Sequence, residues 1–150
     1  MPGLLLHIGS GKAGSTSLQS WLRKQNPELI RRRVHFLECP GATNQTALAC
    51  YAADSGRNLR IRQRLGIGRP EVPGFRERLE REMETEVERY AGQVDWFVAS
   101  SENLFLDLSS RAEVRRLAGL LTRTFDQIKV VVFLRRQDRF AVSQYNDAVK

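Results

Sequence analysis

A chain of 150 residues is long enough for one domain, and its 41% hydrophobic and 27% charged residues are typical of an ordinary soluble globular protein. No stretch approaches the roughly 20 apolar residues of a membrane helix, and no signal peptide is visible, so we expect a cytoplasmic protein without a membrane span. The net charge of +7 favours an anionic partner, such as nucleic acid, a membrane surface, a polyanion or a phosphorylated cofactor. Many arginines fall in the runs 31–33 and 57–69, which a solvated basic surface explains equally well.

The two cysteines, Cys39 and Cys50, form neither a metal-binding pattern nor a disulfide framework. We therefore expect reduced thiols, in agreement with a cytoplasmic location. A single bridge between them stays an alternative.

The first half of the chain begins with a short apolar run, residues 4–8, which predicts a buried parallel strand. A tight glycine loop, residues 9–14, follows it. Residues 15–25 then have the pattern of a helix, with Pro27 just beyond its end. The residues expected on its inner face are Leu18, Trp21 and Leu22. Residues 34–37 predict a second short strand.

The second half of the chain begins with residues 38–74, where three prolines and many Gly, Asn, Thr and Arg residues predict an irregular, partly helical insertion. Beyond it, strands and helices alternate. The predicted elements are a helix at 75–90, a strand at 96–99, a helix at 110–125 with Val114, Leu117, Leu120 and Leu121 inward, a strand at 128–134 and a helix at 139–150. Such alternation predicts a single α/β domain over residues 1–150, built on a parallel sheet flanked by helices.

The stretch HIGSGKAGSTSLQ, which starts at residue 7, joins the first predicted strand to the first predicted helix. It deviates from the nucleotide-triphosphate loop G-x-x-x-x-G-K-[ST] in both possible alignments. With Gly9 and Gly14 as the framing glycines, Ser15 occupies the lysine position. With Gly11 and Lys12 as the G-K pair, both the first glycine and the magnesium-binding hydroxyl are missing.

The same stretch nevertheless has the features of an anion site. Backbone N–H groups at a helix start point outward, and the helix dipole adds partial positive charge. Gly14 permits a close approach of the backbone, and Lys12 adds a full charge. The hydroxyl groups of Ser15, Thr16 and Ser17 add donors. The alternative is a merely capped helix with an incidental lysine.

Two further polar clusters follow predicted strands. Residues 100–103 (SSEN) follow the strand at 96–99, and Arg135 follows the last strand, with Ser143 eight residues later. In an open parallel sheet the carboxyl ends of the strands meet at one crevice. Arg135 and Ser143 therefore predict a second anion site, although a surface arginine and an ordinary helix serine are the alternative.

The segment KAGSTSLQ resembles the 5′-phosphosulfate loop of the sulfotransferases, K-x-G-[ST]-[ST]-x-L, and FLRRQDRFAVSQYN resembles their 3′-phosphate segment. The bacterial and Golgi-type carbohydrate sulfotransferases are the most similar in character. The resemblance covers both ends of the chain and leaves residues 38–94 unmatched. It implies a P-loop-like sulfotransferase fold, 3′-phosphoadenosine 5′-phosphosulfate (PAPS) as the donor, and transfer of its sulfuryl group to a hydroxyl, with a carbohydrate as the expected acceptor.

By this match, Lys12, Gly14, Ser15, Thr16 and Ser17 would bind the phosphosulfate. Arg135 and Ser143 would bind the 3′-phosphate, which adenosine 3′,5′-bisphosphate, the product, retains. The resemblance implies no metal and no nucleic-acid partner. Family members continue past the 3′-phosphate helix, so we expect a C-terminally truncated chain whose activity alone stays open.

The chemistry of sulfuryl transfer assigns two catalytic roles. A lysine aimed at the leaving phosphate oxygen stabilises charge that develops in the transition state, and Lys12 is the candidate. The acceptor hydroxyl must lose a proton, and Glu102 is the candidate base, unless it caps the next helix or pairs with an arginine. His7 is expected to be buried and hydrogen-bonded, whereas His35 could reach the edge of the crevice.

Two other classes of function stay open from the sequence. A phosphotransferase of the nucleoside-kinase type needs a standard lysine and an acidic magnesium ligand, and neither is evident. A non-enzymatic module that binds a polyanion through its arginines would show affinity that falls steeply with salt.

Overall fold

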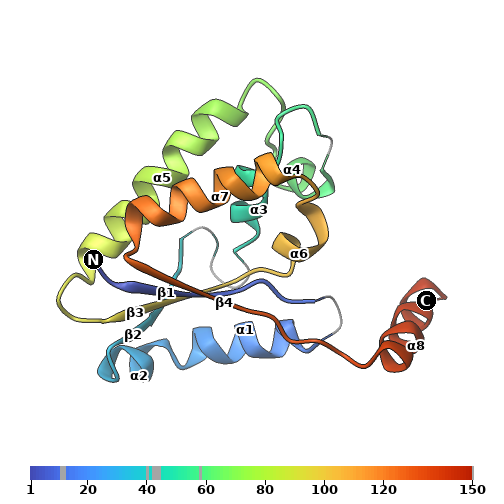
Figure 1. Ribbon diagram of the computed structural model, residues 1–150, viewed down its shortest axis with the longest axis horizontal. Coiled ribbons are helices and arrows are strands. Elements are labelled where there is room, and N and C mark those ends of the chain that lie inside the picture. Colours follow the sequence, from blue (N-terminus) through green and yellow to red (C-terminus); the bar gives the residue numbers. More distant parts are fainter. Residues whose placement is uncertain (11–12, 40, 42–44, 58, 150) are drawn as a thin grey trace.

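The computed structural model describes residues 1–10, 13–39, 41, 45–57 and 59–149, and at its centre lies a sheet of four parallel strands (Figure 1). The elements are, in chain order, β1 (Gly3–His7), α1 (Ser15–Lys24), α2 (Asn26–Arg31), β2 (Val34–Phe36), α3 (Thr46–Ala52), α4 (Arg60–Arg64), α5 (Val72–Arg89), β3 (Trp96–Ser100), α6 (Asn103–Asp107), α7 (Arg111–Thr124), β4 (Gln127–Val131) and α8 (Gln137–Ala148).

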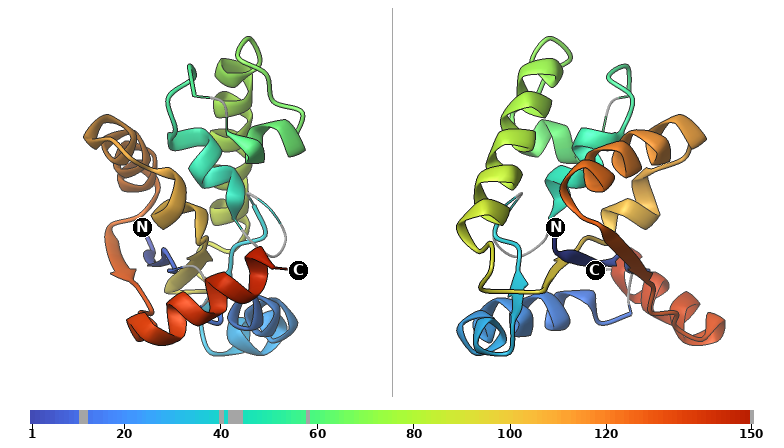
Figure 2. Two further views of the ribbon diagram at one scale, coloured as in Figure 1. Left: turned by 90° about the vertical axis from the view of Figure 1, so that its right-hand side faces the viewer. Right: turned by 60° about the vertical axis from the view of Figure 1, so that its left-hand side comes forward.

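The strands lie in the order β2-β3-β1-β4, so the first strand of the chain is hydrogen-bonded on both sides. In this register Leu5 of β1 lies opposite Val98 of β3 and Lys129 of β4. Helices α1 and α2 cover one face of the sheet, and α3, α5 and α7 cover the other (Figures 1 and 2). The expected α/β class, with a parallel sheet flanked by helices, is confirmed.

Alternation along the strands sends side chains into two separate cores, as both faces of a parallel sheet must be covered. The larger core lies under α3, α5 and α7 and includes Leu4, Leu6, Phe97 and Ala99 from the strands. The smaller core lies under α1 and includes Leu22, Phe36 and Val98. Side chains on the α1 face of β1, such as His7, therefore point away from the larger core.

The first three strands lie within one residue of their predicted ends, and α1, α5 and α7 within three. The prediction for residues 128–134 was wrong at its end, because β4 stops at Val131. The residues after it are exposed apolar side chains, Val132, Phe133 and Leu134. Arg135 therefore follows a short irregular segment and not the strand itself.

Two residues predicted to face inward are exposed: Trp21 at 54% and Val114 at 53%. In α1 the buried face is formed by Ser15, Gln19 and Leu22, because Gln19 is hydrogen-bonded beneath the helix. In α7 the buried stripe begins at Glu113, whose carboxylate is fully paired inside. Leu22, Leu117, Leu120 and Leu121 are buried as predicted, so the buried polar residues change only the edge of each predicted inner face.

The sequence did not predict α2 or α6, nor the burial of α3. Pro27 lies in the first turn of α2, where a missing N–H group costs nothing, so it begins a helix and does not only follow one. Residues 38–74 include α3, whose side chains from Leu48 to Ala52 are all buried in the larger core. Cys50 lies within this run, and both cysteines are free thiols.

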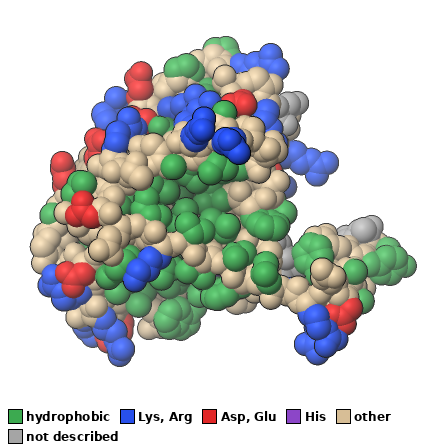
Figure 3. Space-filling view, viewed as in Figure 1, with side chains coloured by type: hydrophobic (Ala, Val, Ile, Leu, Met, Phe, Trp, Pro, Cys, Tyr) green, Lys and Arg blue, Asp and Glu red, His purple; other side chains and the backbone are tan. Residues whose placement is uncertain are grey.

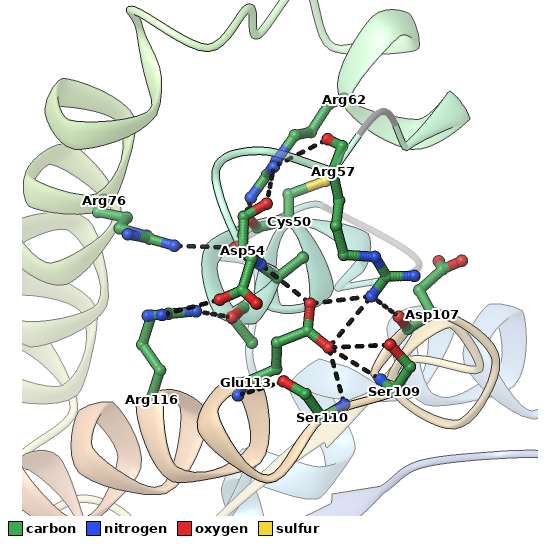
Figure 4. Close-up of polar contacts among 12 residues, drawn as sticks. Cys50, Asp54, Arg57, Arg62, Arg76, Asp107, Ser109, Ser110, Glu113 and Arg116 are labelled. Atoms are coloured by element: carbon green, nitrogen blue, oxygen red, sulfur yellow. Dashed lines mark hydrogen bonds and ion pairs between the residues drawn. The ribbon is translucent and has the colours of Figure 1, made fainter.

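Three arginines bind the carboxyl end of α3 (Figure 4). Arg62, only 3% exposed, donates to the carbonyl oxygens of Cys50 and Ala53 at 2.8 and 2.7 Å. Arg76 from α5 donates to the Tyr51 and Ala53 carbonyls, and Arg116 from α7 to that of Ala52. Cations are favourable at the negative end of a helix dipole. The arginines therefore attach α3 to α4, α5 and α7 at once.

Glu113 joins the same region to the start of α7 (Figure 4). Its carboxylate accepts from Arg57 Nη1 at 2.9 Å and from the backbone N–H groups of Asp54, Ser109 and Ser110, the last as part of a capping box. Burial opposes ionisation, but Arg57 and the backbone donors outweigh it and lower the pKa of Glu113 to about 2. An ionised Glu113 therefore stabilises the fold.

Apolar side chains are exposed at β4, beside the polar residues Gln127 and Lys129. Hydrophobic side chains gather on this side of the molecule below α7 (Figure 3), and Val130 is 60% exposed although it belongs to a strand. Within the described residues, none of the helices has the length and apolar character needed to cross a membrane.

We predict that Glu113→Gln lowers the free energy of unfolding at neutral pH by about 2 kcal/mol, because it removes a charge-assisted acceptor from buried donors. The folded-state pKa lies below the ordinary value of 4.5, so this stabilisation is complete above that pH. It is lost as the pH falls towards 2, and the difference between the variant and the parent should close in this window. Urea unfolding across pH measures it. The exposed Glu84→Gln is the control, and a pH-independent gap would contradict the prediction.

Candidate functional site

The candidate site lies at the carboxyl ends of β1 and β3. The chain leaves β1 towards α1 on one face of the sheet and leaves β3 towards α6 on the other (Figure 1). Neighbouring strands whose connections diverge in this way leave a crevice between them, which is where open parallel sheets bind ligands. Gly9 and Ser10, which follow β1, and the residues after Ser100 lie at this edge of the sheet.

Gly9 is the residue at which these two segments come closest. Its backbone has φ +64, and a Cβ there would lie 2.9 Å from Glu102 Cα. A side chain at this position would therefore strain the backbone and also collide with the chain after β3. Glycine is required here because the two loops touch.

Gly14 occupies the position before the first turn of α1, with φ +84. It has no side chain to accept from the N–H groups of that turn, and the first turn of α1 contains no acidic residue. The positive end of the helix dipole is therefore left without a protein anion from its own helix. An external anion at this end would meet the helix dipole together with the carboxylate of Glu102, which reaches Ser15 from outside α1.

Glu102 and Ser15 meet across the crevice. The hydroxyl of Ser15 donates to Glu102 Oε2 at 2.6 Å. Glu102 stands at the residue before α6, but its side chain does not cap that helix; it reaches back to the start of α1. Glu102 therefore lies at the strand end where the sequence placed the candidate base, and the alternative that its side chain caps α6 is wrong.

The hydrogen bond also changes the expected role of Ser15. Its hydroxyl proton is committed to the carboxylate, so Ser15 can offer an anion its backbone N–H group and not its side chain. The side chains of Thr16 and Ser17 are exposed at the first turn of α1. Lys12, the predicted catalytic lysine, lies outside the described residues.

His7, the last residue of β1, is buried beneath the loop at 2% exposure. Its Nδ1 lies 2.8 Å from Ser100 Oγ, and Gln19 Nε2 donates to the same hydroxyl at 3.1 Å. The prediction of a buried, hydrogen-bonded histidine is confirmed. Burial lowers the pKa of His7 below its ordinary value, and the nearby carboxylate of Glu102 opposes this shift only in part.

His35 does not reach the crevice, contrary to the expectation. It lies within β2, fully buried, with Nε2 at 2.7 Å from Glu86 Oε1 of α5. Its ring stacks on Tyr90 at 3.9 Å between centroids. It belongs to the larger core.

The second predicted anion site is partly assembled. Arg135 and Ser143 both line a hollow of about 250 Å³ together with Asp138, Arg139, Val142 and Asn146. Arg135 also lines a neighbouring hollow of about 280 Å³ with Ala13, Gly14 and Leu134. The structure thus brings Gly14, Arg135 and Ser143 to adjoining hollows that share Arg135.

The segment after β4 is held against the loop by a residue that the sequence reasoning missed. Ser10 Oγ donates to the Phe133 carbonyl oxygen at 2.7 Å, and Ile8 N–H donates to the Val131 carbonyl oxygen. Gln19 was also missed as a member of the site, whereas Ser100 belongs to the polar cluster that the sequence placed after the strand at 96–99. The only signal available was that polar residues occupy the helix face and strand end nearest the glycine loop.

We predict that Gly9→Ala destabilises the protein more than Gly66→Ala does. Both glycines have φ near +65, but a Cβ at Gly66 meets nothing within 4 Å, whereas one at Gly9 meets the Glu102 backbone. The control should lose about 1 kcal/mol from backbone strain alone, and Gly9→Ala should lose clearly more, as measured by urea unfolding. Equal losses would mean that the contact between the two loops is unimportant.

Within the described residues, no group of three or more His, Cys, Asp or Glu side chains is placed to hold a metal ion. No family model, curated protein or solved structure matches this chain.

Proposed function

We propose that the protein is a sulfotransferase of P-loop-like fold that binds PAPS and transfers its sulfuryl group to a hydroxyl, with a carbohydrate as the acceptor. The observation that supports this best is the shared position of Arg135, between the hollow beside Gly14 and the hollow beside Ser143. Two adjoining sites with anion-binding features suit a nucleotide with phosphate groups at both 5′ and 3′ positions. The strand order and the glycine loop before α1 are compatible with this fold.

The residues at the start of α1 fit the 5′ group. The backbone N–H groups of Ser15, Thr16 and Ser17 are available to an anion, and Gly14 lets it approach the backbone closely. Lys12, outside the described residues, is assigned to the same group through the resemblance of KAGSTSLQ to the phosphosulfate loop.

Arg135 and Ser143 are the proposed ligands of the 3′-phosphate. A guanidinium presents a planar pair of donors to a phosphate, and a helix hydroxyl can add one more. Neighbouring Arg136 donates from Nε and Nη2 to Asp138 at 2.6 and 2.5 Å, which directs its guanidinium to that carboxylate.

Glu102 is the proposed base. Bound PAPS would supply the activated sulfuryl group; a bond would form between the acceptor oxygen and sulfur while the bond from sulfur to the phosphate oxygen breaks. Glu102 would take the acceptor's proton, and Lys12 would stabilise the charge that develops on the departing phosphate oxygen. The hydrogen bond from Ser15 orients the carboxylate and leaves its second oxygen for the acceptor.

We predict that adenosine 3′,5′-bisphosphate raises the melting temperature more than AMP or ATP with magnesium does. A ligand at about 100 times its dissociation constant adds about 2.7 kcal/mol to the free energy of unfolding. Thermal unfolding with the three ligands at equal concentrations measures the order. A preference for ATP with magnesium would favour a kinase, and weak salt-sensitive binding of all three would favour a polyanion-binding module.

Two arginine variants test the assignment of the 3′-phosphate site: Arg135→Ala removes a proposed ligand, and Arg136→Ala is its control. Arg135→Ala should weaken binding of the bisphosphate by about 1.5–3 kcal/mol and weaken AMP binding less, because Arg135 lines both the hollow beside Ser143 and the one beside Gly14. Arg136→Ala removes the same charge one residue away, from an exposed pair with Asp138, and should change neither affinity. If Arg135→Ala weakens both ligands alike, the 3′-phosphate site is wrongly assigned.

We predict that Lys12→Ala lowers turnover by about 10²–10³, far more than it raises the dissociation constant of the donor, because the lost charge acts mainly in the transition state. Arginine should not restore the rate, since a planar fork cannot replace a compact ammonium group. Transfer of labelled sulfate to a panel of glycans measures the rate. Lys24→Ala, at the far end of α1, is the charge-matched control. If Lys12→Ala binds PAPS poorly but has normal turnover at saturating PAPS, Lys12 only binds the donor and has no role in the transition state.

A further inference from the structure

Two buried polar atoms at the carboxyl ends of β1 and β3 have no hydrogen-bond partner among the residues that the structure describes: His7 Nε2 and Ser101 Oγ. The two residues are 2% and 0% exposed. Buried polar groups are nearly always paired in folded proteins, so each exception calls for a physical reason. Both lie beside the loop that starts at Gly9.

The contacts of Ser100 favour one tautomer of His7. Ser100 Oγ accepts a hydrogen bond from Gln19 Nε2 at 3.1 Å and has one proton of its own to donate. The acceptor within reach is His7 Nδ1, at 2.8 Å. A histidine that accepts at Nδ1 is neutral only with its proton on Nε2. His7 Nε2–H is then a buried donor without an acceptor.

The position of β1 in the sheet gives the direction of that donor. Nδ1 points towards Ser100 on β3, and the two nitrogens of an imidazole ring point to different sides. Nε2 therefore points away from β3, to the side of β4, where the Phe133 ring lies 5.0 Å from the histidine ring. Phe133 is followed by Leu134 and Arg135, which line the hollow beside Ala13 and Gly14.

We propose that His7 is a further ligand-binding residue: as a neutral imidazole held by Ser100 and Gln19, it donates its Nε2 proton to an oxygen of the 5′ anionic group of the nucleotide. This inference rests on the proposed function, because the nucleotide is the ligand proposed there. The burial that lowers the pKa of His7 keeps the ring neutral at physiological pH, so it orients the anion without adding a charge. Gln19 and Ser100 are positioning residues that act through His7.

Long-range ¹H–¹⁵N spectra of the two histidines test the proposal, with His35 as an internal control in the same molecule. His7 should have the Nε2–H tautomer at neutral pH without ligand. AMP and adenosine 3′,5′-bisphosphate, which have a 5′-phosphate, should both shift its Nε2 signal, whereas adenosine 3′-phosphate should not. His35, buried against Glu86, should respond to none of the three. An Nδ1–H tautomer or a charged ring at neutral pH would overturn the proposal.

Variants separate a role in binding from a role in packing. His7→Phe keeps a ring against Phe133 but has no donor, and it should weaken AMP binding by about tenfold. His7→Gln restores an N–H group and should recover part of the affinity. Ser100→Ala removes the hydroxyl group that donates to His7 Nδ1. It should give a mixture of His7 tautomers and a loss of AMP affinity smaller than that of His7→Phe. Melting temperatures show whether each variant is folded. If a variant does not fold, the spectra of the parent protein decide whether His7 Nε2 binds the nucleotide.

The result for the parent protein separates the role of His7 from the proposed function. If adenosine 3′,5′-bisphosphate binds and the His7 signals do not move, the role of His7 is wrong and the proposed function stands. If none of the nucleotides binds, the proposed function fails, and the role of His7 fails with it.

Discussion

The position of β1 between β3 and β4 is the constraint on which the site depends. Because its backbone is hydrogen-bonded on both sides, its carboxyl end cannot shift without disturbing two neighbours. The loop that follows must therefore leave the sheet in a narrow gap, with Glu102 on one side and the segment through Phe133 on the other. The positive φ of Gly9 and the absence of its side chain are consequences of that gap.

Hydrogen bonds between side chains and loops hold the carboxyl ends of the strands and the start of α1 together. Ser15 and Glu102 join the start of α1 to the end of β3, and Ser10 joins the loop to the chain after β4. His7, Ser100 and Gln19 form a third connection beneath them. The proposed donor site is therefore held on rigid elements, whereas Arg135 and Ser143 belong to an exposed segment and helix at the edge of the sheet.

The region between β2 and β3 is stabilised by charge as well as by apolar burial. Three guanidinium groups, from Arg62, Arg76 and Arg116, bind carbonyl oxygens at the end of α3. A basic sequence with many arginines first suggested an anionic partner or a solvated surface, and the structure gives these three a different use. An arginine that satisfies backbone acceptors inside the protein contributes to the net charge but not to an open binding surface.

The sequence by itself determined the α/β class, the first three strands and the place of the glycine loop, because apolar periodicity and glycine restrict the backbone locally. It also placed Glu102 at the end of β3 and Gly14 before the first helix, since parallel strands share one carboxyl edge, whereas Arg135 follows an irregular segment after β4. Only the tertiary structure decided that Gln19 and Glu113 face inward while Trp21 and Val114 are exposed. It likewise decided that His35 belongs to the core and that His7 has an unpartnered nitrogen. These outcomes depend on partners distant in the chain, namely Ser100, Arg57 and Glu86, and a local pattern contains no information about which distant group will supply a hydrogen bond.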